Sequence, residues 1–204
     1  MFQGFSPETI DFLWGIRMNN NRDWFMPNKK MYTQFLYEPM KALGADLFQS
    51  FLDKPGNLLK VSRIYRDARL HHPDPNQESL WICIRRDVEW WAENPCLYFE
   101  INPEGVHYGC FFWHPRPQKM EEFLALMDSG QAATGTPVTA DLYKRPKEAA
   151  DQRLAPYFAW KGNIACVRDE PVSEDIFGPA LGQRAKEFQA HLIPLYDYLN
   201  RFAV

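Results

Sequence analysis

The sequence lacks the features typical of proteins that bind nucleic acid or cross membranes. Its formal net charge of −3 and its pI of about 6.0 leave no general basic field that would attract a phosphate backbone. No stretch approaches the roughly 18 consecutive apolar residues of a membrane span. Residues 1–5 contain no basic segment that leads into an apolar run. We therefore expect no nucleic-acid partner, no membrane association and a cytoplasmic location.

Metal-binding and disulfide patterns are also missing. The chain has four widely spaced cysteines without a C-x-x-C pair, at Cys83, Cys96, Cys110 and Cys166. This spacing argues against zinc and against a disulfide scaffold, and it predicts buried free thiols. His71 and His72 precede Asp74, but adjacent histidines point apart and the sequence offers no third ligand. We expect neither a metal nor a cofactor.

The common catalytic fingerprints do not occur either. The sequence contains no G-x-S-x-G, H-E-x-x-H, phosphate-binding-loop or dinucleotide-binding pattern. Ser62 has no partner base that the sequence identifies. Whether the protein is an enzyme therefore stays open, and no catalytic residue is predicted.

What the sequence does contain is a concentration of arginine in residues 60–69. Arg63, Arg66 and Arg69 recur at every third position, with Asp67 among them. A guanidinium is planar and permanently charged, and its five donors suit paired recognition of carboxylate or phosphate oxygens. A carboxylate at Asp67 could hold a neighbouring guanidinium in place. The pattern predicts a site for an anionic small molecule.

Two arrangements of these arginines remain open. In a regular strand Arg63 and Arg69 point to one face and Arg66 to the other, whereas in a polyproline-like or 3₁₀ segment all three share one edge. Their role is open as well, because arginines that tie helices to a sheet through ion pairs mimic a functional site. The acidic candidates for such ties are Glu38, Glu89 and Glu100.

A second basic segment, residues 144–147, is interrupted by a proline. It is either a solvated turn or the far wall of an anion site. The predicted ligand-binding residues are Arg63, Arg66, Asp67, Arg69, Lys144 and Arg145.

Length and composition favour a single α+β domain over residues 1–204. Hydrophobic residues make up 46% of the chain and charged residues 24%, which is ordinary for a globular protein. The aromatic content of 15%, with seven Trp and fifteen Phe, is high. It indicates an aromatic-rich core or an aromatic-lined groove.

Helical periodicity recurs along the chain. The predicted helices cover residues 7–18, 31–37, 40–52, 118–127 and 179–202. Ser6 can cap the first of them, Pro39 should break or kink the chain after Tyr37, and Pro194 should bend the last.

From residue 58 the period changes to that of strands. The predicted strands cover residues 58–66, 81–83, 98–101, 106–113 and 163–170. Residues 102–105 form a hairpin loop, and the proline-rich residues 70–79 form a surface loop. These elements predict a central, mainly antiparallel sheet packed by N-terminal and C-terminal helices.

Four segments carry a family resemblance. They are Gly4-Phe5-Ser6-Pro7 with Phe12-Leu13, the turn Asn20-Asn21-Arg22-Asp23-Trp24-Phe25, the arginine segment, and the passage from Tyr108-Gly109 to Trp113-His114-Pro115. On these residues most of the chain resembles a widespread bacterial family catalogued as domain of unknown function 2461. The resemblance implies a fold-level relative and a motif, without a reaction.

The family motif is R-x-x-R-D-x-R-F followed by x-x-x-[DN]-K-x-x-Y. Its first half stands here as Arg63, Arg66, Asp67 and Arg69. Leu70 replaces the phenylalanine and Asp74 keeps the acidic position. Pro75 replaces the lysine and Glu78 the tyrosine. If the lysine and tyrosine complete an anion site in the family, this chain lacks them.

Two classes of function follow from these observations. In the first, the arginine cluster binds, and in an enzyme acts on, a phosphorylated or carboxylated small molecule. In the second, the chain is a protein interaction module in which arginines and exposed tryptophans form a recognition surface. The tryptophans considered for that surface are Trp81, Trp90, Trp91, Trp113 and Trp160.

Overall fold

The computed structural model describes residues 1–67, 69–70, 73–91, 94–112, 139–142 and 160–200. The predicted helix at residues 118–127, the basic residues Lys144 and Arg145, and the pair His71 and His72 lie outside these ranges.

Helices form the N-terminal part and the C-terminal end of the described chain. They are α1 (Pro7–Met18), α2 (Arg22–Met31), the π-helix η1 (Tyr32–Tyr37), α3 (Glu38–Phe48), the short 3₁₀ helices η2 (Gln49–Phe51) and η6 (Glu174–Ile176), and α6 (Ala180–Leu199). The predicted helix at residues 7–18 is confirmed as α1. The predicted final helix at residues 179–202 is confirmed as α6, which begins at Ala180 and ends at Leu199.

Local sequence explains where α1 begins. Ser6 has an extended backbone at the N-cap, and a proline occupies the first turn, where its missing N–H is not needed. The Thr9 hydroxyl accepts a hydrogen bond from the Ser6 N–H at 3.2 Å and donates to the Phe35 carbonyl at 2.6 Å. The same side chain therefore closes the start of α1 and attaches it to η1.

Of the two outcomes predicted for Pro39, a break in the helix is wrong, although the π-helix η1 does give way to α3 after Tyr37. The chain stays helical from α2 through η1 into α3, because Met31 and Glu38 at the two ends of η1 both have right-handed helical backbones. The Glu38 N–H reaches back five residues to the Thr33 carbonyl. The wider π-helical turn before Pro39 accommodates the residue that cannot donate.

The described strands form one six-stranded sheet, with the order β1-β2-β3-β4-β6-β5. The strands are β1 (Asn57–Val61), β2 (Leu80–Arg86), β3 (Pro95–Asn102), β4 (Gly105–Phe112), β5 (Thr139–Leu142) and β6 (Trp160–Pro171). Every neighbouring pair is antiparallel. The α+β fold class and the hairpin at residues 102–105 are therefore confirmed.

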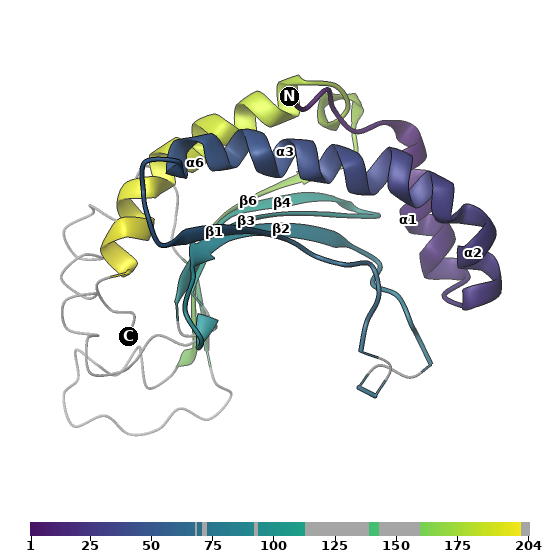
Figure 1. The fold of residues 1–204 in the computed structure, drawn as a ribbon, viewed down its shortest axis with the longest axis horizontal. Helices are drawn as coiled ribbons and strands as arrows, with labels where there is room; N and C mark the ends of the chain where they lie inside the picture. The colour runs from purple at the N-terminus through teal and green to yellow at the C-terminus, as the bar shows by residue number, and fades with distance from the viewer. Residues whose placement is uncertain (68, 71–72, 92–93, 113–138, 143–159, 201–204) are drawn as a thin grey trace.

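The helices cover one face of this sheet. Figure 1 shows α3 and α6 lying across the sheet, which curves away beneath them, while α1 and α2 extend past its edge. The predicted buried stripe of α6 is confirmed and consists of Leu181, Ala185, Phe188, Leu192, Leu195, Tyr196 and Leu199. Among the helices that the structure describes, none combines the length and apolar character needed to cross a bilayer.

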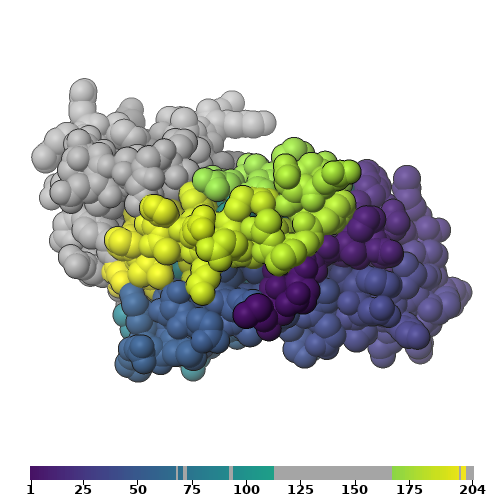
Figure 2. Space-filling model, turned by 90° about the horizontal axis from the view of Figure 1, so that it is seen from above, coloured from purple at the N-terminus to yellow at the C-terminus, as the bar shows by residue number. Residues whose placement is uncertain are grey.

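The N-terminal segment closes the helical layer. Figure 2 shows it between the C-terminal helix and the blue α3 region. The Phe2 N–H donates to the Asp46 carboxylate of α3 at 2.6 Å, and the Phe2 ring lies against Gly182 of α6. Phe5 forms a parallel bridge with Phe177. The N-terminal segment therefore packs against the start of α6 and the residues before it.

Aromatic rings connect these layers through the core. The Phe2 and Phe5 rings lie 5.2 Å apart, and Phe5 stacks on Phe99 of β3 at 6.1 Å. Phe99 stacks on Tyr108 of β4, whose ring meets Phe188 of α6, each at 5.6 Å. All five are buried, so much of the aromatic excess is in the core.

The first strand is shorter than predicted. β1 ends at Val61, so the interpretation of residues 62–66 as its continuation is wrong. The regular ladder ends at Ser62, because its side-chain Oγ accepts the hydrogen bond from the Trp81 N–H at 2.9 Å. Residues 75–79 are likewise not a freely solvated loop, since they pair with residues 62–66.

Candidate functional site

The arginine segment is held beside the residues that precede β2. The Ser62 N–H donates to the Trp81 carbonyl at 2.7 Å, and the Arg66 N–H donates to the Pro75 carbonyl at 2.9 Å. Between them, the Gln77 N–H donates to the Ile64 carbonyl at 2.6 Å. The segment is therefore an irregular extension of the sheet that runs antiparallel to residues 75–77, with an isolated bridge between Tyr65 and Asn76.

Burial alternates along this segment. Ser62 and Ile64 are buried, whereas Arg63 and Tyr65 are exposed and Arg66 is half-buried. Ile64 anchors the segment in the core, since it is 0% exposed. The polar side chains next to it remain accessible to a ligand.

Of the predicted residues, the structure joins Asp67 and Arg69. Nε of Arg69 lies 3.0 Å from Oδ1 of Asp67, and Nη2 lies 2.6 Å from Oδ2. This paired hydrogen bond raises the pKa of Arg69. In the described part of the chain, the guanidiniums of Arg63 and Arg66 have no carboxylate within ion-pair distance.

The acidic residues considered as structural partners lie elsewhere. Glu38 pairs with Lys41 at 3.2 Å. Within the described residues, Glu89 and Glu100 take part in no ion pair. Lys144 and Arg145 lie outside the described residues. A ligand-binding role for the cluster stays a prediction.

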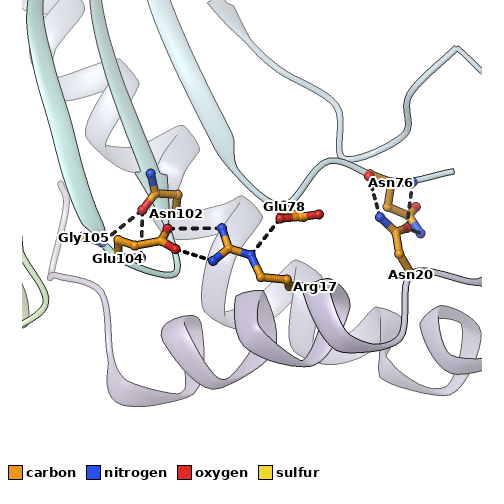
Figure 3. A network of polar contacts seen from close by, with 7 residues as sticks. All are labelled: Arg17, Asn20, Asn76, Glu78, Asn102, Glu104 and Gly105. Carbon is orange, nitrogen blue, oxygen red and sulfur yellow. Dashed lines mark hydrogen bonds and ion pairs between the residues drawn. The ribbon is translucent and has the colours of Figure 1, made fainter. Parts of the chain in front are cut away.

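The segment that faces the arginines presents alternate side chains to two different surroundings. Asn76 and Glu78 contact the end of α1, as Figure 3 shows, while Gln77 and Ser79 line a pocket. This is the alternation of an extended chain, in which successive side chains point to opposite faces. Gln77 also donates from Nε2 to the Arg63 carbonyl at 2.7 Å. Gln77 therefore links the pocket wall to the arginine segment.

Arg17 at the end of α1 connects two loops. Its Nε lies 2.7 Å from Oε2 of Glu78, and its Nη1 and Nη2 atoms donate to both carboxylate oxygens of Glu104, the latter bond being 3.1 Å long. The Trp14 ring lies 5.0 Å from the guanidinium carbon. These hydrogen bonds raise the pKa of Arg17 and lower that of Glu104.

An amide pair reinforces this connection (Figure 3). Oδ1 of Asn20 accepts hydrogen bonds from the Asn76 N–H at 3.0 Å and from Nδ2 of Asn76 at 3.1 Å. Nδ2 of Asn20 donates to the Asn76 carbonyl at 2.9 Å. Because Asn76 is only 2% exposed, these three bonds satisfy polar groups that water does not reach.

The pocket lies on the sheet face opposite the helices. It has a volume of about 390 Å³, and its described lining residues are Gln77, Ser79, Trp81, Cys83, Trp91, Cys96, Tyr98, Glu100 and Phe111. Strand register brings them together, since Trp81 pairs with Glu100 and Cys83 with Tyr98. The volume is within the range of about 300–1,000 Å³ that is usual for small-molecule sites.

The interior of the pocket is largely uncharged. Burial raises the pKa of Cys83, Cys96 and Tyr98, so the thiols and the phenol stay protonated at neutral pH. Glu100 is the one acidic side chain among the lining residues that the structure describes. Its neighbour across the strands, His107, is already bonded to Asp169 and to Asn102, at 2.6 and 2.9 Å.

Cations lie on the aromatic rings at the pocket edge. The Lys60 ammonium lies 5.9 Å from the centre of the Trp81 ring, and the Arg85 guanidinium carbon lies 5.5 Å from that of Trp91. Both are within the distance at which a cation is attracted by a π face. The pocket thus combines flat aromatic surfaces, one carboxylate and a positively charged edge.

Comparison with protein families matches the model of a conserved hypothetical protein family, DUF2461, over residues 8–198. The chain belongs to this family. The match covers most of the sequence and confirms the resemblance carried by the arginine motif. DUF2461 has no assigned function, and a search of the curated proteins finds no match to this chain.

The two residues at which this DUF2461 member departs from the second half of the motif both take part in hydrogen bonds within the protein. Glu78, at the motif's tyrosine position, is held by Arg17, so its carboxylate is engaged within the protein. Pro75, at the lysine position, offers its carbonyl to the Arg66 N–H. Both departures therefore have structural roles in this chain.

Sequence reasoning missed the Arg17 network and the pocket. Arg17 gives no local signal, because its partners lie 61 and 87 residues away. A signal for the pocket did exist. In residues 81–85 and 96–100 four of the six positions facing away from the core carry rings or thiols, which is unusual for a solvated sheet face: Trp81, Cys83, Cys96 and Tyr98.

Proposed function

We propose that this protein binds an anionic small molecule, carrying a phosphate or carboxylate group, at Arg63 and Arg66. One observation supports the proposal most strongly: two accessible guanidiniums without acidic partners in the described chain are held by a hydrogen-bonded segment beside a pocket. Structural arginines are normally paired, because a carboxylate satisfies their donors. We assign binding and no reaction.

The held segment reduces the entropy cost of binding. Three backbone hydrogen bonds fix residues 62–66, and Ile64 anchors them, so the backbone that carries both arginines is ordered before the ligand arrives. Arg69 is already bound to Asp67 and would contribute mainly to the local field. The anion is therefore expected to contact Arg63 and Arg66 and not to depend on Arg69.

The test is thermal unfolding with phosphate, nucleotides and dicarboxylates at millimolar concentration. An anion at about ten times its Kd stabilises the native state by roughly 1.4 kcal/mol, which raises the Tm by about 3–6 °C. The double variant Arg63→Met, Arg66→Met should lose this shift and keep the Tm of the free protein. Arg22→Met, which removes an exposed arginine of α2, should retain it.

Two results would oppose the proposal. Unchanged anion shifts in the double variant would place the anion elsewhere. The absence of any shift with the wild-type chain would favour the alternative, an interaction module. One observation supports that alternative: Trp91, which lines the pocket, is 41% exposed, and the adjacent Trp90 is 69% exposed.

A further inference from the structure

We infer that the pocket on the sheet face opposite α3 and α6 binds a planar nitrogen heterocycle whose edge carries two adjacent N–H donors, as guanine does. The inference rests on the proposed function only for an anionic group attached to the ring. Recognition of the ring itself depends on the pocket alone, and it goes beyond anion binding at the arginines.

Stacking surfaces account for the planar shape. Four of the described lining residues are aromatic, namely Trp81, Trp91, Tyr98 and Phe111, and they come from β2, β3, β4 and the turn after β2. The Tyr98 and Phe111 rings meet edge to face at 6.1 Å. Opposite Tyr98 in the register stands Gly109, which has no side chain to fill the space above the strand. Flat rings gain most from such walls.

The carboxylate of Glu100 is the reason to expect two N–H donors on the edge of the ligand. An ionised carboxylate accepts hydrogen bonds at both oxygens and donates none. In the part of the chain that the structure describes, Glu100 has no hydrogen-bond or ion-pair partner, and both ring nitrogens of His107 beside it are already engaged. A guanine edge offers N1–H and N2–H side by side, which matches two carboxylate oxygens. An adenine edge offers one donor beside an acceptor, which a carboxylate would repel.

The charges around the pocket argue against a ligand that is cationic overall. Lys60 and Arg85 already lie against Trp81 and Trp91, and the thiols of Cys83 and Cys96 are protonated. A neutral ring satisfies Glu100 without repulsion from these cations. An anionic group on the same molecule would be attracted to the positively charged edge.

The geometry connects the ring pocket to the anion site. Gln77 lines the pocket and donates to the Arg63 carbonyl at 2.7 Å, so the two sites adjoin through one side chain. A guanine nucleotide would place its base against Glu100 and its phosphate toward Arg63 and Arg66. The ligand class is thus a phosphorylated or carboxylated derivative of a guanine-like ring.

Calorimetric titration of the full chain with guanosine, adenosine and guanosine monophosphate tests the inference. Guanosine should bind at least about tenfold more tightly than adenosine, because adenosine leaves the carboxylate unpaired. Glu100→Gln should remove that preference, whereas the control Glu89→Gln, an exposed carboxylate, should keep it. Trp81→Leu should weaken both nucleosides, and circular dichroism checks that each variant is folded.

The outcomes separate this inference from the proposed function. Equal affinity for guanosine and adenosine, no binding of either, or an unchanged preference in Glu100→Gln would overturn the inference. Phosphate binding would still stand or fall with Arg63 and Arg66. Conversely, a guanosine preference without any gain from the monophosphate would support the ring pocket and count against the anion site.

Discussion

Nε of Arg17 lies 2.7 Å from a carboxylate oxygen of Glu78, and the same guanidinium binds both oxygens of Glu104. The contact joins the end of α1 to the segment that forms the pocket wall and to the β3–β4 hairpin. Glu78 is also the residue that stands at the tyrosine position of the arginine motif.

Arg17→Met should destabilise the protein by about 1–2 kcal/mol. This loss exceeds the roughly 0–1 kcal/mol of an exposed ion pair for two reasons. The substitution removes the shared partner of both Glu78 and Glu104, and the Arg17 side chain is only 29% exposed. Urea unfolding at pH 7 measures the change. Lys41→Met, which breaks the exposed pair with Glu38, is the control and should cost less than about 0.5 kcal/mol. Equal effects of the two substitutions would contradict the role assigned to Arg17.

Asn20→Ala should cost about 2–3 kcal/mol, because it leaves the backbone and side-chain N–H groups of the buried Asn76 without their acceptor. The neighbouring Asn19→Ala is a matched control, since Asn19 is exposed and its side chain bonds only to the Gly15 carbonyl of its own helix. We expect less than about 1 kcal/mol for it. Chemical denaturation measures the free energy of unfolding of both variants. A loss for Asn20→Ala no larger than that for Asn19→Ala would mean that water replaces the Asn20 amide.

Gly105→Ala should be far more costly than Gly178→Ala. Both glycines have positive φ, 153° and 79°, but a Cβ at Gly105 would lie 2.1 Å from the Glu170 carbonyl oxygen, whereas one at Gly178 meets nothing within 4 Å. Backbone strain alone costs about 1 kcal/mol at Gly178, and the clash raises the cost at Gly105 to about 3 kcal/mol or more. Thermal unfolding gives the comparison, and similar Tm values would exclude the clash.

Stability should fall in acid partly through Glu170. Burial opposes ionisation of this carboxyl, but hydrogen bonds from Arg184 and Tyr108 outweigh burial and lower its pKa below the ordinary 4.5. Since the folded-state pKa is the lower one, the stabilisation is complete above pH 4.5 and is lost as the pH falls through the folded value.

Glu170→Gln should therefore lower the free energy of unfolding at pH 7 and make its decline in acid shallower than in the wild-type chain. Unfolding by urea at a series of pH values between neutrality and pH 3 measures both effects. Glu38→Gln, in which a carboxylate 55% exposed is removed, provides the comparison. A variant that keeps the full wild-type slope would show that other carboxyls cause the acid loss.

The parts of the fold set by local pattern could be predicted. The bounds of α1, the stripe of α6 and the hairpin before Gly105 follow from periodicity, caps and turn residues within a few positions of one another. The end of β1 at Val61 could not, because it depends on a hydrogen bond from the Trp81 N–H to the Ser62 side chain, between residues 19 positions apart in the sequence.

The candidate site was predictable only in part. The spacing of the arginines is visible in the sequence. The lack of acidic partners at Arg63 and Arg66 is a property of the folded chain, as far as the structure describes it. The ring pocket needs the register that sets Trp81 against Glu100 and Cys83 against Tyr98. Alternation says which residues share a face, and pairing between strands says which of them meet.

The place of Phe2 and Phe5 bears on how the protein is made. Their packing partners include Gly182 and Phe177, so these contacts can form only after the ribosome has synthesised the start of α6. Before that, Phe2 and Phe5 can meet only partners that precede β6, such as Asp46 and Phe99. This corner of the core is therefore completed late in synthesis.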